Sequence, residues 1–449
     1  MDWKPLSIVS SYIYNNITLP RVSPTYMPNE WTPPSYKYVI VRIMEILSTI
    51  HPNYCVVVLC LICVLLFVYI KIKYPFWNTQ PVVHTYDYWR RWFVREAHII
   101  YKLPYKSRFH DKENKISTMD YSRVDTPEKH QLTVFLQSHY IPTDRLLSTI
   151  STPVLDAYLS GHNAPSFLSI HRELDGRITG MTTSRLIHVY FYTGNVRSNI
   201  EAYFTDFMCI HRECSGRGIA ERVFQTHEYN RRVRNHLIPV SLFRKEGELC
   251  EGVVPFISYT TYTYYMRNLD VRPLFPGFTI SRVSKHNTDL LHDIYHILTK
   301  PNTDGATLSM FSVCILPDLG NILSLLEKRE LFLFCLKKGE HLFGIYIFRN
   351  AHIHYEELDG ETLELVATIQ NTDNTPVFMS GFMHSLREIL KGNREYKMIR
   401  IPSIGHNQVV LSKWREYHHS VLETPGALYL YNYVLPKMTV DSYTCLAIM

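Results

Sequence analysis

The stretch DFMCIHRECSGRGIAERVF, from Asp206 to Phe224, decides the fold prediction. Its first residues, DFMCI, are typical of a buried strand, and apolar residues at helical spacing begin near Ile219. Between them lies a polar turn, SGRG, with two glycines and Arg217. Such a turn leaves backbone N–H groups uncovered where a helix N-terminus offers unpaired donors and a positive dipole end. The stretch therefore predicts a strand, a turn suited to a phosphate, and a helix.

This turn by itself does not identify a ligand. No Gly-Lys-Ser/Thr follows it, so the signature of a P-loop is absent. Arg217 could add a charge-assisted contact to a phosphate. An ordinary glycine turn is the plainer interpretation when the stretch is taken alone.

The composition is that of a globular chain long enough for two or three domains. It has 449 residues, 46% hydrophobic and 20% charged, with a net charge of +6 from scattered Lys and Arg. Nucleic acid is therefore a poor candidate partner, and an anionic small ligand or a membrane surface stays open. The nine cysteines are mostly far apart, which favours a reduced setting over a disulfide framework. The histidines form no paired ligand motif, so no metal is expected.

An uncharged run, YCVVVLCLICVLLFVYI, predicts a transmembrane helix over residues 52–72. It is long enough to cross about 30 Å of hydrocarbon as one helix. A buried core helix is the alternative, but the run has no polar face. A cleaved signal peptide is disfavoured because the run starts some fifty residues into the chain.

The charges around this run predict its orientation. Four basic residues follow it closely and two precede it: Lys71, Lys73, Arg90 and Arg91, against Lys37 and Arg42. The positive-inside rule then places the large C-terminal part in the cytosol. The tail, residues 1–51, is expected on the lumenal or exterior side, where the sequon at Asn16 could be glycosylated.

Beyond the predicted span, apolar runs mix with helical patterns, which indicates an α/β architecture. Candidate strands are FLSIHREL, RITGMTTSRL, LIHVYFYT and IEAYFTDFMCI. A short internal echo, Ser-Arg-Val before a polar patch and a helical pattern, begins at Tyr121 and again at Phe278. It suggests a duplicated module, although a three-residue identity can be accidental. The cluster VRPLFPGF predicts a boundary between domains 73–277 and 278–449.

Three segments carry a resemblance to a known family. They are KYPFWNTQPV (Lys73–Val82), DFMCIH and LYLYNYVLP (Leu428–Pro436). In order and approximate spacing they resemble the signature segments of N-myristoyltransferases: Phe-Trp-x-Thr-Gln-Pro-Val, the strand Asn-Phe-Leu-Cys-Val-His, and Leu-Tyr-Asn-Trp before an apolar terminus. The resemblance covers Tyr74–Met449 loosely.

The resemblance implies two similar halves of the acetyltransferase superfamily type. The first half would bind myristoyl-CoA as a co-substrate, with no tightly bound cofactor, and the second would supply much of the peptide groove. The residues expected at the acyl-CoA, with Arg217 added for its charge, are Pro75, Phe76, Trp77, Cys209, Ile210, Gly216, Arg217, Gly218, Ile219 and Ala220. The sequence departs from the family at Ser215 and Gly218, where arginines are usual. For Phe76 and Trp77 the alternative is an aromatic belt at a membrane interface.

The resemblance also implies the chemistry. Backbone N–H groups of Phe207 and Met208 would point at the thioester oxygen, and the carboxylate of Met449 would accept the proton of the attacking amine. An α-amine with a pKa near 7.7 to 8.0 must lose a proton before it attacks. Donors fixed at a strand bulge would stabilise the oxyanion. The uncharged tail SYTCLAIM could be buried or frayed.

The peptide side of the pattern is thinner. Tyr140, Tyr264 and Tyr265 are the expected peptide contacts, but the acidic and aromatic loop of the family is replaced by PTDRLLSTIS, and its Asp-Gly pair by Pro425-Gly426. Three hypotheses follow. They are a membrane-anchored N-myristoyltransferase acting on N-terminal glycines, a non-catalytic membrane-tethered protein that binds acyl-CoA or lipidated peptides, and an acetyltransferase acting on another amine.

Overall fold

The computed structural model describes residues 52–141, 146–193, 196–266, 269, 271–284, 287–299, 311–358, 360–392 and 396–449 of the chain. Two compact units are distinguished, which meet in the sequence between Thr79 and Gln80. The predicted tail, its Asn16 sequon and the flanking Lys37 and Arg42 lie outside the described residues. Gln80–Met449 is a single compact unit, so the domain boundary placed at 277/278 stays a prediction.

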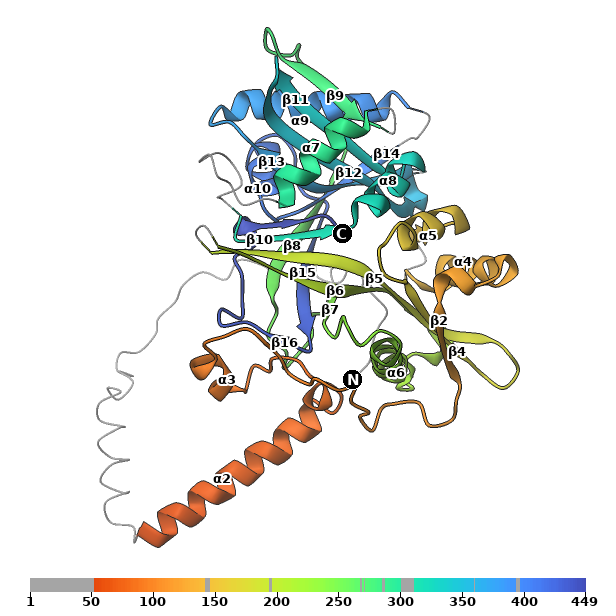
Figure 1. Cartoon of the computed structure of the whole chain (residues 1–449), viewed down its shortest axis with the longest axis vertical. Coiled ribbons are helices and arrows are strands. Elements are labelled where there is room, and N and C mark those ends of the chain that lie inside the picture. Colours follow the sequence, from red (N-terminus) through yellow and green to blue (C-terminus); the bar gives the residue numbers. More distant parts are fainter. Residues whose placement is uncertain are drawn as a thin grey trace, which may run out of the picture. The chain divides into compact units, whose positions relative to one another are not determined.

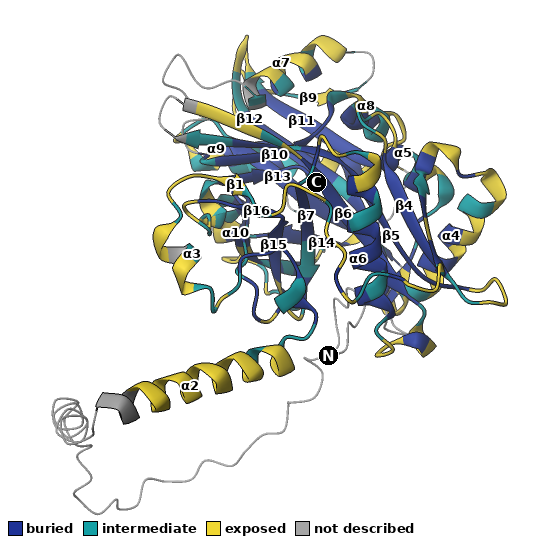
Figure 2. Cartoon of the chain, turned by 60° about the horizontal axis from the view of Figure 1, so that its bottom comes forward, coloured by how far each residue is buried: buried dark blue, intermediate teal, exposed yellow. Residues whose placement is uncertain are grey.

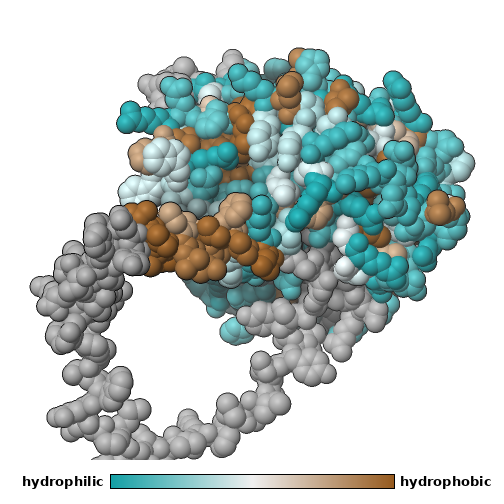
Figure 3. All heavy atoms as spheres, turned by 90° about the horizontal axis from the view of Figure 1, so that it is seen from below, coloured by the Kyte–Doolittle hydropathy of each residue, from teal (hydrophilic) through white to brown (hydrophobic). Residues whose placement is uncertain are grey.

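The helix α2 (Pro52–Lys73) is the main element of the unit Ser10–Thr79. Its window Val56–Lys73 is long and apolar enough to cross a membrane, and none of it is buried. Figure 3 shows its exposed side chains as a continuous hydrophobic surface. The short 3-10 helix Trp77–Thr79 follows. The predicted span thus forms one helix with no polar face.

The first half of Gln80–Met449 alternates short helices with strands (Figure 1). Its elements are α3 (Tyr88–Phe93), β1 (His98–Ile99), β2 (Ile116–Asp120), α4 (Thr126–His139), β3 (Leu146–Ser148), α5 (Thr152–Leu159), β4 (Phe167–Arg172), β5 (Ile178–Thr193), β6 (Val196–Ile210), α6 (Ile219–Arg234), β7 (Ser241–Glu246) and β8 (Ile257–Tyr265).

The second half repeats this alternation. Its elements are β9 (Thr279–Val283), α7 (Thr288–Thr299), β10 (Val313–Pro317), α8 (Leu319–Glu327), β11 (Leu331–Lys338), β12 (His341–Tyr355), β13 (Gly360–Gln370), α9 (Thr375–Leu390), β14 (Tyr396–Pro402), α10 (Asn407–Trp414), β15 (Leu422–Tyr431), β16 (Tyr433–Val434) and β17 (Cys445–Ala447). Mixed helices and strands confirm the predicted α/β class.

The sheet pairings show that the two halves share one design. In the first half β5 pairs antiparallel with β6, α6 crosses over, and β7 pairs parallel with β6. In the second half β12 pairs antiparallel with β13, α9 crosses over, and β14 pairs parallel with β13. The Ser-Arg-Val triplets do not occupy matching places, because Arg123 lies in a 3-10 helix after β2 and Arg282 lies inside β9. The repeat is therefore visible in the topology, and the triplets do not mark it.

The two candidate strands RITGMTTSRL and LIHVYFYT form one strand, and predicting them as two was wrong. β5 runs unbroken from Ile178 to Thr193. The two candidates meet at Leu186, and β5 passes through this residue while paired with β6. The polar residues Thr182, Thr183 and Ser184 are fully buried in the strand. The hydroxyls of Thr182 and Thr183 donate to the carbonyl of Asp206 at 3.1 and 3.3 Å. Because hydrogen bonds to the neighbouring strand satisfy these groups, they stay inside the sheet.

Gly180 on β5 sets the approach of α6 to the sheet. A Cβ there would lie 2.9 Å from the side chain of Ile210 and 3.2 Å from those of Ile219 and Val223. A larger residue would push α6 away from the sheet that supports its N-terminus.

The C-terminal tail is threaded into the sheet. β17 pairs in parallel with β10, which pairs antiparallel with β5 of the first half. Every residue from Cys445 to Ile448 is buried. Figure 1 shows the C-terminus at the centre of the unit Gln80–Met449. The uncharged residues Cys445–Ile448 are therefore buried in the fold and do not fray.

Candidate functional site

A β-bulge interrupts β6 at Phe207 and Met208. The pairing of β6 with β5 shifts register between Met181–Cys209 and Thr183–Asp206. Phe207 takes a left-handed φ of 50°, which costs on the order of 1 to 3 kcal/mol for a bulky residue. Strain of this kind persists only where the surrounding structure imposes it. The bulge that the sequence predicted for the acyl-transfer step is therefore present as backbone geometry.

The carboxylate of Asp206 occupies this bulge. It accepts hydrogen bonds from the N–H of Phe207 at 2.9 Å and from the hydroxyl of Tyr158 at 2.8 Å. The ring of Phe207 packs against those of Tyr158 and Tyr140, at centroid distances of 5.0 and 5.7 Å. One of the two predicted oxyanion donors is thus held by the neighbouring carboxylate.

The end of the chain meets the same region from the other half. Arg349 on β12 donates to the terminal carboxylate of Met449 and, through Nε, to Glu364 at 2.8 Å. One guanidinium thus links the last residue to Glu364.

A cavity of about 120 Å³ brings the bulge and the chain terminus together. Among the predicted site residues, Tyr140, Phe207 and Met449 line it. Met208, Cys209 and Ile210 are buried in β6 and are not among its lining residues. The cavity lies where the two halves meet, because Phe207 comes from β6 and Arg349 from β12.

Charged side chains form much of the wall of this cavity. The three cations Arg244, Arg349 and Arg400 face the two carboxylates Glu246 and Glu364 and the carboxylate of the chain terminus. Arg400 bonds Glu246 at 2.6 Å, and Arg244 lies 3.8 Å from it. Cations and carboxylates are thus paired in this wall, as buried charges require.

The pKa values follow from this pairing. Burial alone would raise the pKa of Glu246, but Arg400 and Arg244 outweigh burial and lower the pKa to about 2. The pKa of Glu364 is lowered for the same reason, chiefly by Arg349 against the effect of burial. Both carboxylates are therefore ionised at neutral pH, and neither is free to take a proton there.

Two residues outside the prediction, Asp206 and Arg185, also line the cavity. Arg185 is 1% exposed, stacks on the Tyr158 ring at 3.7 Å and donates to Asn321 Oδ1 at 2.6 Å. Its Nε and second terminal nitrogen find no hydrogen-bond partner among the described residues. The signal for Asp206 was in the sequence, because an Asp stands where the family strand begins with Asn. The burial of Arg185 could not be read from the sequence.

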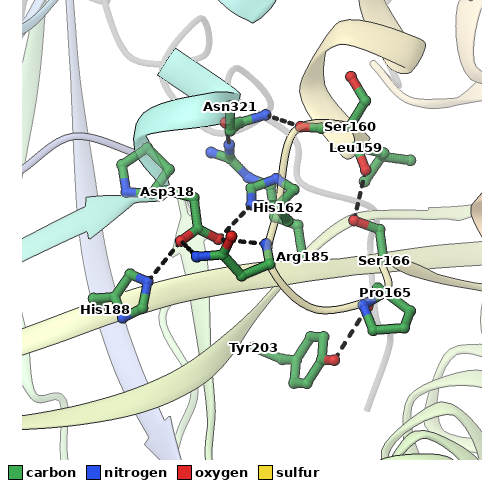
Figure 4. A network of polar contacts seen from close by, with 12 residues as sticks. Leu159, Ser160, His162, Pro165, Ser166, Arg185, His188, Tyr203, Asp318 and Asn321 are labelled. Atoms are coloured by element: carbon green, nitrogen blue, oxygen red, sulfur yellow. Dashed lines mark hydrogen bonds and ion pairs between the residues drawn. The ribbon is translucent and has the colours of Figure 1, made fainter. Parts of the chain in front are cut away.

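A second polar cluster joins the halves beside Arg185 (Figure 4). The carboxylate of Asp318 lies 2.9 Å from His188 Nε2 and accepts a hydrogen bond from the side-chain amide of Asn163 at 2.8 Å. His162 Nδ1 lies 3.5 Å from its other oxygen. Burial alone would raise the pKa of Asp318, but the hydrogen bonds from His162 and His188 lower it. This cluster ties β5 to the start of α8.

The predicted phosphate turn surrounds a separate small hollow of about 10 Å³. Gly216, Gly218, Ile219 and Ala220 line it, and the two glycines take φ values of 76° and 71°. Arg217 is exposed beside them. Gly218 is the N-cap of α6 and provides no side-chain cap.

Glu221 also lines this hollow, from the first turn of α6. Its carboxylate lies 4.0 Å from where a Cβ of Gly218 would be. A phosphate in the hollow would meet this negative charge, so Glu221 has to turn away for an anion to enter.

The remaining predicted contacts lie elsewhere. Tyr264 is fully buried in the second-half core, 6.3 Å from the Trp414 ring, and Tyr265 is 37% exposed at the end of β8. Neither lines the cavity. Phe76 and Trp77 are buried and pack edge to face at 4.9 Å, so they do not form an exposed aromatic belt. Pro75 precedes them in the unit Ser10–Thr79, and the roles of these residues stay predictions.

Among the residues that the structure describes, no group of three or more His, Cys, Asp or Glu side chains is arranged to hold a metal ion.

Comparisons with solved structures identify proteins of similar fold. No family model matches the sequence, and no curated protein matches it. Three structures of Saccharomyces cerevisiae N-myristoyltransferase with bound myristoyl-CoA, one of them also with inhibitors, are similar, with TM-scores of 0.60, 0.62 and 0.62 at 11%, 11% and 12% identity. They cover 80%, 84% and 81% of this chain and 93%, 94% and 91% of their own. At this identity the likeness shows the fold alone, and the chain has the two-half α/β architecture of these acyltransferases.

Proposed function

We propose that this protein is a membrane-anchored N-myristoyltransferase, which moves a myristoyl group from myristoyl-CoA to the α-amine of an N-terminal glycine. One observation carries the proposal: Phe207, at the bulge, and Met449, the last residue, line one cavity. An acyltransferase needs fixed donors for an oxyanion and a group that accepts a proton, within reach of one another. The yeast enzymes of the same fold hold myristoyl-CoA.

The proposed reaction uses these groups in sequence. The glycine ammonium gives its proton to the carboxylate of Met449, and the neutral amine attacks the thioester carbon. The oxyanion of the tetrahedral intermediate is stabilised by the N–H groups of Phe207 and Met208. Its collapse breaks the carbon–sulfur bond and releases CoA as a thiolate, which takes up the second proton of the amine nitrogen as the amide forms. The first proton, held by the Met449 carboxylate, then passes to solvent. The acyl oxygen must displace the Asp206 carboxylate from the Phe207 N–H.

The remaining assignments belong to the same proposal. The glycine turn at Gly216 and Gly218 would take the pyrophosphate of CoA, and the helix α2 would anchor the enzyme with residues 73–449 in the cytosol. Tyr140, with its ring against Phe207, would contact the peptide end that enters the cavity.

The test is amide formation by the full chain in nanodiscs. Labelled myristoyl-CoA and a panel of glycine-starting peptides are expected to give acylated peptide by mass spectrometry, and the same peptides starting with alanine should give none. Acetyl-CoA should compete poorly. Product with acetyl-CoA but not with myristoyl-CoA would contradict the chain-length assignment, and no product from any peptide would contradict catalysis.

A variant with one glycine added after Met449 tests the proton acceptor. The addition moves the carboxylate by up to about 3.5 Å, and turnover should fall by about a hundredfold. Lys437→Ala, an exposed change in the same terminal segment, serves as the matched control. Unchanged turnover in the extended variant would assign the proton to another group, with Asp206 the nearest alternative.

A non-catalytic acyl-CoA or lipidated-peptide binding protein is the second candidate. It is favoured by the two groups that the mechanism needs free: the Phe207 N–H is bonded to Asp206, and the Met449 carboxylate is bonded to Arg349. Tight myristoyl-CoA binding without turnover, unchanged by the added glycine, would select this function.

A further inference from the structure

The segment Tyr88–Arg108 carries an unusual number of large side chains in solvent. We call its exposed apolar and aromatic residues the aromatic patch; its members are Tyr88, Trp89, Trp92, Phe93, Tyr101, Leu103 and Tyr105. Trp89 is 73% exposed and Trp92 is 80% exposed. Figure 2 shows α3, which carries four of these residues, almost wholly exposed. The rings of Trp89 and Phe93 lie 4.1 Å apart, and clustered exposed aromatic side chains of this kind mark a binding surface in soluble proteins.

The backbone under this patch is held firmly. The N–H of Tyr101 donates to Asn432 Oδ1 at 2.8 Å, and β1 pairs with β16. The buried Arg232 of α6 donates to the carbonyls of Tyr101 and Leu103 at 2.7 and 3.0 Å. These bonds fix the backbone at Tyr101 and Leu103. The start of α3 is fixed separately, because the side chain of Asp87 accepts from the N–H of Arg90 at 3.2 Å.

The charge of the same segment is strongly positive. Six Lys or Arg residues and one Glu lie between positions 88 and 108: Arg90, Arg91, Arg95, Lys102, Lys106, Arg108 and Glu96. Trp and Tyr with interspersed Lys and Arg are the side chains favoured at the headgroup level of a bilayer. Each basic residue near an anionic leaflet adds to the attraction between the segment and the lipid.

Chain continuity joins this segment to the proposed membrane span. Tyr88 follows Lys73, the last residue of α2, by 15 positions. A chain of that length reaches about 50 Å at most. A membrane helix tethers such a nearby segment to the bilayer, and the segment therefore meets lipid at a high effective concentration.

We infer that the aromatic patch is a membrane-docking surface that inserts Trp89 and Trp92 into the headgroup region of an anionic leaflet. The basic residues of the same segment face the lipid phosphates and carboxylates. The inference rests on the span proposed for α2 and is independent of acyl transfer. It gives Gln80–Met449 a second attachment to the bilayer.

Tryptophan quenching by brominated lipids tests the insertion. The full chain is reconstituted in nanodiscs of phosphatidylcholine with or without phosphatidylserine, with acyl chains brominated or plain. Bromolipid should quench the wild type, and Trp89→Phe with Trp92→Phe should lose about half of that quenching, because interfacial tryptophans lie near the acyl chains. Tyr417→Phe, 82% exposed in the second half, is the matched control. Equal quenching in the wild type and the double variant would overturn the insertion.

Hydrogen exchange of residues 88–108 tests the charge. Protection should be several-fold greater in anionic than in neutral nanodiscs, and should fall with Arg95→Gln, Lys102→Gln and Lys106→Gln together. The control changes three exposed lysines of the second half, Lys328, Lys338 and Lys391, to glutamine. Protection that ignores lipid charge, or that rises with protein concentration in detergent, would overturn the inference and assign the patch to a second copy of the chain. A chain that fails to enter nanodiscs would instead contradict the span proposed for α2.

Discussion

The helices α6 and α9 occupy equivalent places in the two halves, yet their N-termini differ. α9 begins after Asn374, whose side chain accepts from the N–H of Val377, and a proline stands in its first turn. α6 begins after Gly218, in a left-handed conformation and without a side-chain cap. In the second half a side chain caps an N–H group in the first turn of α9. In the first half no side chain caps the N–H groups in the first turn of α6.

The two halves therefore share a topology but differ at the N-terminus of the equivalent helix. In the first half α6 starts without a side-chain cap, whereas in the second half Asn374 caps α9, and this half contributes Arg349 and Met449 to the cavity. Duplication alone would predict the same cap at both helix starts, whereas only α9 has one. Changes at the two helix starts, and in the ionic wall between the halves, can break or sharpen this comparison.

The largest effect is expected where the halves share charges. Arg400→Met removes the second-half partner of Glu246 and leaves that carboxylate buried without its closest cation. Unfolding free energy should fall by about 3 to 5 kcal/mol, as for other buried pairs broken on one side. Urea denaturation measures this, with Lys413→Met, which breaks an exposed pair with Glu416, as control at about 0 to 1 kcal/mol. A similar small loss in both variants would mean that the halves do not depend on this pair.

Low pH should reduce the free energy of unfolding, because it protonates Glu246 in the wall of the cavity. The folded pKa of Glu246 is about 2, below its unfolded value of 4.5. Its stabilisation is therefore complete above about pH 5 and is lost as the pH falls toward 2, by about 3 kcal/mol. Denaturation at a series of pH values should show this slope in the wild type and a shallower one in Arg400→Met. Equal slopes would contradict the assignment to Glu246.

Gly218→Asp should selectively disable the first half. A carboxylate at the N-cap of α6 would repel an incoming pyrophosphate, and binding of myristoyl-CoA should weaken by about a hundredfold. Gly218→Asn has the same shape without the charge and should lose far less affinity. Asn374→Asp at α9 should leave acyl-CoA binding unchanged. Calorimetric titration separates the three variants, and equal losses at both helices would refute a single ligand turn.

Glu221→Gln is expected to have the smallest effect, and in the opposite direction. Removing the negative charge beside the hollow should tighten acyl-CoA binding several-fold, because the anion no longer meets a carboxylate. Glu173→Gln, distant in sequence from the turn, is the control. Weaker binding in Glu221→Gln would show that this side chain supports the site.

Much of this arrangement was predictable from local sequence. The run after Pro52 determined a helix able to span a membrane, since no charge or polar face interrupts it over that length. DFMCI and the spacing from Ile219 determined the strand and helix, and α6 does begin at Ile219. The unbroken course of β5 was missed, because the pairing with β6 that joins its two candidate strands is a long-range contact.

The tertiary structure alone decided which of these pieces meet. Phe207 and Met449 are far apart in the sequence, and only the threading of β17 beside β10 brings the terminus to the cavity. The burial of Arg185 and the pairing of Arg349 with the terminal carboxylate depend on contacts between the halves. Local pattern fixes periodicity and caps because these involve neighbours a few residues apart. Charge partners and cavity walls are set by long-range packing, which no short stretch of sequence encodes.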